Sequence, residues 1–93
     1  MKKSVIVIGA GMGGMTAAIH LANRGYQVTV IEKNAHPGGR CDRISRDGHH
    51  FDTGPTLLVM PLLYEAELAA LGSSLHGALD LQRVDPTYHL VFD

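Results

Sequence analysis

The sequence predicts an α/β fold built around a parallel sheet, in which a Rossmann-type β-α-β unit occupies the amino-terminal part of the chain. A short apolar run with many β-branched residues, Val5–Ile8, has the composition of a strand that is buried on both faces of a parallel sheet. A second such run, Val28–Ile31, follows after a stretch of helical length and leads directly to an acidic residue, Glu32. Between the two runs stand three glycines in the spacing G-x-G-x-x-G: Gly9, Gly11 and Gly14.

Each glycine of this motif has its own physical role. Gly9 permits a tight turn from the strand into the helix, and Gly11 has no Cβ that would keep a ligand from the backbone. Gly14 lets the helix pack closely on the strand. The spacing then predicts a packed seam along one helical face, formed by Gly14, Ala18, Leu21 and Gly25.

The start of the predicted helix is suited to an anion, because the first N–H groups of a helix have no partner and the helix dipole is positive there. Glu32 lies 18 positions after Gly14, close to the spacing of the acidic residue that accepts hydrogen bonds from an adenosine ribose. These features predict a bound dinucleotide diphosphate. The charge of Glu32 disfavours a ribose 2′-phosphate and hence NADP, although the neighbouring Lys33 favours one. The alternative is an ordinary glycine-rich turn followed by an exposed glutamate.

Composition narrows the function classes. With 93 residues the chain is short for a complete two-substrate oxidoreductase, and we expect it to be a fragment. The formal net charge of −1 disfavours nucleic-acid binding. The six histidines and the one cysteine show no metal-ligand spacing, so no metal site is predicted. The glycines within the first apolar stretch argue against a secretion signal, and a cytoplasmic location is expected.

A glycine-rich loop follows Glu32. Gly38, Gly39 and Arg40 form a second place where a phosphate can approach the backbone closely while a guanidinium donates charge-assisted hydrogen bonds. The alternative is a surface turn with a solvated arginine. Next, the dipeptide Asp47-Gly48 predicts a tight hairpin between the strands 43–45 and 49–51.

The rest of the chain is read as the transition to another domain. The sequence Gly54-Pro55-Thr56 predicts an extended or turned backbone. Pro61 predicts the start of a helix that runs to about Leu71 and ends at Gly72. Apolar runs at 79–84 and 88–92 predict a second hairpin. We therefore expect residues 1–71 to be the amino-terminal part of a nucleotide-binding domain and residues 72–93 to begin an α+β substrate domain.

Three blocks of the sequence resemble one known family. GAGMGGMTAAIHLANRGYQVTVIEKNAHPGGR, FDTGPTLLVMP and VDPTYHLVF together are similar to the amino-terminal portion of phytoene desaturase-like carotenoid enzymes, a branch of the FAD-dependent amine oxidase superfamily. The first block is shared by the superfamily and implies FAD. The other two are typical of the carotenoid branch, and the resemblance covers nearly the whole chain.

The resemblance also implies roles for particular residues. Gly9, Gly11, Gly13 and Gly14 would lie along the FAD diphosphate, and Glu32 would hold the adenosine ribose. Gly38, Gly39 and Arg40 would reach the diphosphate and the flavin side, while Gly54, Pro55 and Thr56 would approach the isoalloxazine ring. Met12 and Lys33 complete the predicted cofactor-binding set.

The function implied by the resemblance is the desaturation or isomerisation of a carotenoid precursor such as phytoene, with the flavin accepting hydride. The full-length protein is then an oxidoreductase acting on an apolar polyene, with peripheral membrane contact through regions outside this chain. We expect the chain alone to be inactive, and no catalytic residue is predicted in it. The alternatives are an amine or protoporphyrinogen oxidase-like flavoprotein and a non-catalytic nucleotide-binding module.

Overall fold

The computed structural model describes residues 1–93 and divides into two compact units, Met1–Met60 and Pro61–Asp93. The division precedes the helix that begins at Pro61, whereas the sequence places the domain boundary after Leu71. This helix therefore groups with the carboxy-terminal residues. The assignment of the two parts to a cofactor domain and a substrate domain stays a prediction.

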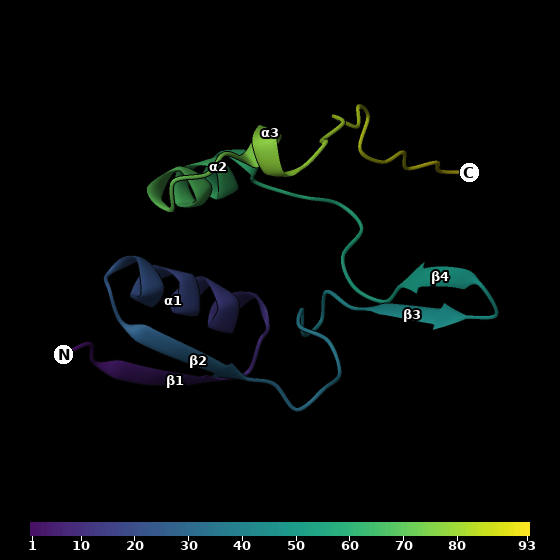
Figure 1. Ribbon diagram of the computed structural model, residues 1–93. Helices are drawn as coiled ribbons and strands as arrows, with labels where there is room; N and C mark the ends of the chain where they lie inside the picture. Colours follow the sequence, from purple (N-terminus) through teal and green to yellow (C-terminus); the bar gives the residue numbers. More distant parts are fainter. The chain divides into compact units, whose positions relative to one another are not determined.

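The first unit opens with the predicted β-α-β arrangement. Strand β1 (Ser4–Ile8), helix α1 (Met12–Asn23) and strand β2 (Gln27–Ile31) follow one another in the chain, and α1 lies along the two-stranded sheet (Figure 1). The strands pair in parallel, in a register that runs from Ser4 opposite Gln27 to Ile8 opposite Ile31. Antiparallel strands can be joined by a tight turn, but parallel strands need a crossover such as α1. The α/β fold class is confirmed.

The sheet is covered on one face only. Val5, Val7 and Val28 are half-buried, while Ile6 and Ile8 alternate with them and are 63% and 85% exposed. The prediction that Val5–Ile8 is buried on both faces is thus wrong for this chain. The alternation follows from the two-residue period of a strand, and within the first unit α1 is the helix in contact with β1 and β2.

Helix α1 ends in a Schellman motif. Gly25 has a φ of +89°, and the N–H of Tyr26 donates to the carbonyl oxygen of Leu21 at 3.1 Å. The seam predicted along the helix therefore stops at Leu21. Ala18 is buried within it, but Gly25 lies beyond the last helical residue, where a Cβ would meet no atom within 4 Å. Gly25 is needed for its left-handed backbone and not for packing.

The predicted first hairpin is present. Strands β3 (Arg43–Arg46) and β4 (His49–Asp52) pair antiparallel, and the turn between them places both Asp47 and Gly48 at positive φ, 51° and 78°. Such a turn matches the right-handed twist of the flanking strands. All eight strand residues are exposed, so the hairpin projects from the unit.

The second unit contains helix α2 (Pro61–Ala70) and the short helix α3 (Leu75–Ala78). Gly72 ends α2 as predicted, with a φ of +79° and with the Ser73 N–H donating to the carbonyl oxygen of Leu68 at 2.8 Å. Helix α3 was not predicted. Ser74 caps it by accepting a hydrogen bond from the Gly77 N–H at 3.0 Å, and Leu75 is 1% exposed.

The predicted second hairpin is wrong. Residues 79–93 contain no strand, and the large apolar side chains of this stretch are exposed except for the half-buried Leu81. An isolated two-stranded hairpin is marginal in water unless a further strand or a helix covers it. The two apolar runs are therefore insufficient to form strands in this chain.

Candidate functional site

The candidate site is formed where the loops after β1 and β2 meet. The chain leaves both strands at the same edge of the sheet because the strands are parallel. In an open α/β sheet, ligands bind beyond the carboxyl ends of the strands. The residues of the predicted cofactor-binding set lie in these two loops, in the first turn of α1 and in the segment that follows β4.

The turn from β1 into α1 is fixed by backbone contacts. Gly9 has a φ of +99°, and its N–H donates to the carbonyl oxygen of Ile31 on β2 at 2.7 Å. A Cβ on Gly14 would overlap the carbonyl group of Gly9 and touch Val7. The predicted role of Gly14 in close packing of the helix on the strand is thus seen in the contacts. Ala10, between the first two glycines, is 5% exposed.

The amino terminus of α1 presents free donors. Gly11 is the N-cap and gives no side-chain cap, and the first internal hydrogen bond of the helix runs from the Met15 N–H to the Gly11 carbonyl oxygen at 3.0 Å. No acidic residue occupies the first turn. The N–H groups of Met12, Gly13 and Gly14 are therefore open to an anion, and the dipole of the 12-residue helix attracts one.

Glu32 lies beside this turn. Its Oε1 accepts a hydrogen bond from the Ala10 N–H at 3.3 Å, and its Oε2 lies 3.5 Å from the backbone nitrogen of Asn34. An ionised carboxylate offers about four lone-pair positions, so capacity remains for two ribose hydroxyl donors. The half-buried carboxylate is thus held against the backbone of the glycine turn, and the ribose contact stays a prediction.

The second glycine loop joins the first. The Gly38 N–H donates to the carbonyl oxygen of Ala10 at 2.8 Å, and Gly38 forms a parallel β-bridge with Gly11. Gly39 has a φ of +62°, and a Cβ on it would lie 3.2 Å from the Cα of Gly11. Two segments 27 positions apart therefore run side by side. At position 39 glycine is required both for the backbone conformation and for the close approach to Gly11.

Gly54 extends this assembly. A Cβ on Gly54 would overlap the carbonyl group of Arg40 and lie 3.3 Å from the Cα of Cys41, and the Thr53 N–H donates to the carbonyl oxygen of Asp42 at 3.0 Å. The segment after β4 thus packs on the backbone of the second glycine loop. The neighbouring Pro55 and Thr56 are exposed.

The space beside Gly11 and Gly13 is open. A Cβ on Gly13 would meet no atom within 4 Å, and one on Gly11 would meet only the Cα of Gly39, at 4.0 Å. Neither residue has a positive φ. Packing within the chain therefore does not require glycine at these two positions, whereas the close approach of a ligand to the unpaired N–H groups does.

The remaining members of the predicted set have exposed side chains. Met12 is 48% exposed, and the side chains of Lys33 and Arg40 are exposed as well. The structure brings together Gly9, Gly11, Gly14, Glu32, Gly38, Gly39 and the backbone of Arg40 with Gly54. It leaves Met12, Lys33, the Arg40 guanidinium, Pro55 and Thr56 free to meet a ligand.

Two participants were missed by sequence reasoning. Ala10 donates its N–H to Glu32 and accepts a hydrogen bond from Gly38, so its backbone links the three loop segments. Asn34 contacts the other oxygen of the Glu32 carboxylate through its backbone. Backbone contacts leave no signature in residue type, and the one available signal was the small residue between two motif glycines.

Other chemistry is sparse. No group of three or more His, Cys, Asp and Glu side chains is placed to hold a metal ion. Cys41 is an exposed thiol, and the Ser45 hydroxyl and His50 Nδ1 form a cross-strand hydrogen bond of 2.7 Å on the exposed hairpin. None of the helices is both long and apolar enough to span a bilayer.

Comparison with known proteins identifies the family. The family model described as NAD(P)-binding Rossmann-like domain matches residues 7–70. The chain is 47% identical over 93 residues to a phytoene desaturase of Fusarium fujikuroi, with 99% of the chain and 16% of that protein covered. It is 43% identical over 90 residues to a zeta-carotene-forming phytoene desaturase of Myxococcus xanthus, covering 97% of the chain and 17% of the relative.

A solved oxidoreductase from Methanosarcina mazei has a similar fold. It matches with a TM-score of 0.62 and 30% sequence identity, over 76% of this chain and 18% of that one. The chain spans about a sixth of the length of the curated relatives it matches. The resemblance to phytoene desaturase-like carotenoid enzymes is confirmed by these relatives, and the chain belongs to the NAD(P)-binding Rossmann-like domain family.

Proposed function

We propose that this chain forms the start of the FAD site of an oxidoreductase that desaturates or isomerises an apolar carotenoid precursor such as phytoene. The proposal depends above all on the hydrogen bond from the Gly38 N–H to the Ala10 carbonyl oxygen, at 2.8 Å. This bond joins a second glycine loop to the dinucleotide-binding turn. The names of the relatives, phytoene desaturases of a fungus and a bacterium, support the substrate class.

We favour FAD over NAD(P) for two reasons, the charge of Glu32 and the extent of the surface that the glycine loops form. Glu32 disfavours the 2′-phosphate of NADP by like-charge repulsion. The second loop joins the first turn through the bridge between Gly11 and Gly38, and Gly54 packs on the carbonyl group of Arg40, so the proposed cofactor surface extends beyond the first turn to the loop that carries Arg40. Such a surface suits a cofactor that stays bound through the catalytic cycle, as a flavin does.

Within this proposal the chain positions the cofactor and does not perform the chemistry. Bound FAD would accept hydride from the substrate. The N–H groups of Met12, Gly13 and Gly14 hold the diphosphate, and Glu32 holds the adenosine ribose. The Arg40 guanidinium, on the loop that Gly54 supports, donates charge-assisted hydrogen bonds to the diphosphate.

The outer part of the site is proposed on the same grounds. Lys33 is exposed next to Glu32 and screens the cofactor phosphates from the carboxylate. Pro55 and Thr56 follow the tightly packed Gly54 and face the isoalloxazine ring. Substrate contact, peripheral membrane contact through regions outside this chain and a cytoplasmic location stay predictions.

The experiment is the purification of the full-length protein followed by identification of its cofactor. We expect a yellow protein whose heat-released cofactor is FAD by mass spectrometry, and which introduces double bonds into phytoene or isomerises a related polyene. A colourless protein that retains NAD(P) would contradict the cofactor assignment. A flavoprotein that oxidises amines and leaves phytoene unaltered would contradict the substrate assignment.

A further inference from the structure

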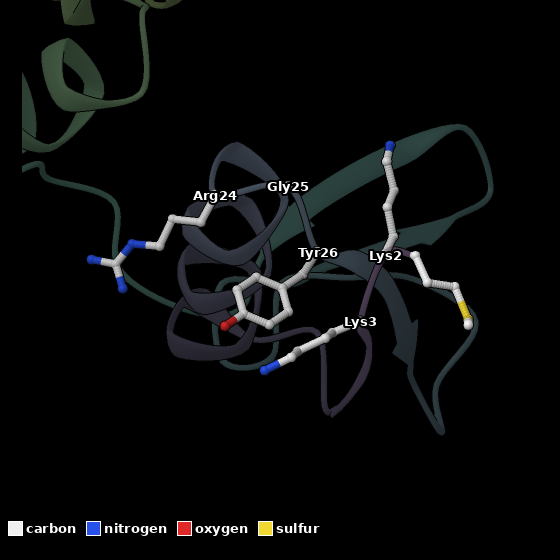
Figure 2. Close-up of a pocket in the computed structure, with 6 residues that line it drawn as sticks. Lys2, Lys3, Arg24, Gly25 and Tyr26 are labelled. Atoms are coloured by element: carbon white, nitrogen blue, oxygen red, sulfur yellow. The ribbon is translucent and has the colours of Figure 1, made fainter.

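A second feature lies at the opposite edge of the sheet from the glycine loops. An open hollow with a volume of about 380 Å³ is lined by Met1, Lys2, Lys3, Arg24, Gly25 and Tyr26 (Figure 2). Lys2 and Lys3 precede β1, and Arg24 follows α1. The Gln27 N–H donates to the Lys3 carbonyl oxygen at 2.9 Å, which ties the two stretches together. We call Lys2, Lys3 and Arg24 the basic patch.

The charge of this part of the chain is strongly one-sided. The three residues of the basic patch are the only Lys and Arg residues up to Ile31, and the first acidic residue of the sequence is Glu32. After Ile31 the sequence has five basic and nine acidic residues. A chain with a net charge of −1 thus concentrates positive charge at one edge of its first unit.

The side chains of the basic patch are arranged to meet a surface. All three are exposed, and in Figure 2 the charged ends of Lys2, Lys3 and Arg24 point in different directions. A single small anion is bound by groups that converge, whereas splayed cations match an array of separate charges. Tyr26, half-buried beside them, has an aromatic body and a polar tip, the character of residues enriched at membrane–water interfaces.

We propose that the basic patch binds the anionic headgroups of a lipid bilayer. The inference rests in part on the proposed function, because an apolar polyene is dissolved in a bilayer and its enzyme must reach the bilayer surface. Charge complementarity selects the anionic headgroups, and Tyr26 adds an interfacial contact. The occupant is a lipid surface contacted by this chain itself, apart from any contact through other regions of the protein.

The basic patch and the dinucleotide site do not compete. The patch lies before the amino ends of β1 and β2, and the glycine loops follow their carboxyl ends. Each strand has five residues, which separates the two edges by about 15 Å at roughly 3.3 Å per residue. Lipid binding through the patch therefore leaves the cofactor site open.

The strength of the contact follows from the number of charges. A Lys or Arg near an anionic bilayer surface strengthens binding about five-fold, so three of them contribute about 150-fold. Salt screens such charges, because the Debye length falls from about 10 Å at 0.1 M to about 3 Å at 1 M. The contact is thus reversible and sensitive to salt.

The test measures co-sedimentation of the full-length protein with vesicles of phosphatidylcholine containing about one third phosphatidylglycerol, at about 0.1 M and about 1 M NaCl. We expect the double variant Lys2→Gln/Lys3→Gln to bind about 30-fold more weakly at low salt, and Arg24→Gln to weaken binding about five-fold further. The matched control Arg46→Gln/Arg83→Gln removes two exposed cations elsewhere and should change binding less than two-fold.

Several results would overturn the proposal. These are unchanged vesicle binding by the patch variants, an equal loss in the control, and an equal loss on vesicles of phosphatidylcholine alone. The proposal would also be overturned if the patch variants lost binding to RNA or to a protein but still bound vesicles. Unchanged melting temperatures verify that the exposed substitutions leave the fold intact.

The experiment distinguishes failure of the proposed function from failure of the lipid-binding proposal. Vesicle binding is measured without substrate and does not require a flavin. The patch variants should also keep their cofactor and their turnover of detergent-solubilised polyene, because the patch is remote from the cofactor site. A protein that binds vesicles through the patch but holds no FAD contradicts the proposed function alone.

Discussion

Gly11 and Gly14 are glycines for different reasons, and a matched pair of alanine substitutions separates them. At Gly11 an added Cβ would meet only the Cα of Gly39, at the ordinary contact distance of 4.0 Å, and its φ of −74° suits alanine. At Gly14 an added Cβ would overlap the Gly9 carbonyl group, with the carbonyl carbon at 3.0 Å. The first change removes space for a ligand, and the second removes space for the protein's own backbone.

The expected magnitudes follow from these contacts. Gly11→Ala should leave the melting temperature of the cofactor-free full-length protein nearly unchanged. It should weaken FAD by the loss of about one charge-assisted hydrogen bond, roughly 1.5–3 kcal/mol or about 10- to 150-fold in Kd. Gly14→Ala should destabilise the cofactor-free protein by about 1–3 kcal/mol, because backbone atoms must shift.

The assay combines thermal melting of the stripped protein with fluorescence titration of FAD. Equal FAD affinity of Gly11→Ala and wild type would refute the placement of the diphosphate at the α1 amino terminus. A cofactor-free Gly14→Ala protein as stable as wild type would refute the packing argument. Gly25→Ala is a useful reference, since it strains a positive φ of 89° far from the cofactor and should lower stability without changing FAD affinity in the folded protein.

Three further predictions concern single contacts. Glu32→Gln, which keeps the shape but removes the charge from the acceptor of the Ala10 N–H, should weaken FAD by about 1–2 kcal/mol in a binding titration; an unchanged Kd would contradict the ribose contact. Gly72→Ala should cost about 1–2 kcal/mol because of its positive φ, with Gly72→Asn less harmful, and equal melting temperatures for wild type and both variants would contradict the left-handed backbone at the end of α2. Ser74→Ala should remove the α3 cap at a cost of about 1 kcal/mol, visible as faster hydrogen exchange of the Gly77 amide, and unchanged exchange would argue against the cap.

The local features of the fold could be predicted from the sequence. The β-α-β order, the glycine turn, the Asp47-Gly48 hairpin and the end of α2 at Gly72 each depend on residues within a few positions of one another. Such features follow from backbone preferences that act over short range, above all the tolerance of glycine for positive φ.

Errors arose where neighbours decide the structure. Residues 79–93 contain two apolar runs typical of strands but form none, and Ile6 and Ile8 have the composition of buried residues but are exposed. Strands need partners, and burial needs a covering layer. Helix α3 shows the opposite case. Its first N–H is bound by the Glu65 carboxylate at 3.0 Å, a contact across ten positions that no local pattern reveals.

For the candidate site, the sequence by itself determined which residue types are present: glycines at the spacing of a dinucleotide-binding turn, an acid after the second strand, and a second glycine pair beside Arg40. Only the tertiary structure decided that these become one surface, through the Gly38 N–H bound to the Ala10 carbonyl oxygen and the Glu32 carboxylate bound to the Ala10 N–H. The physical reason is that parallel strands bring their following loops to one edge, where backbone groups distant in sequence pair with one another. The sequence shows which positions are glycine and therefore lack a side chain. Only the fold shows which part of the chain comes close to each of these glycines.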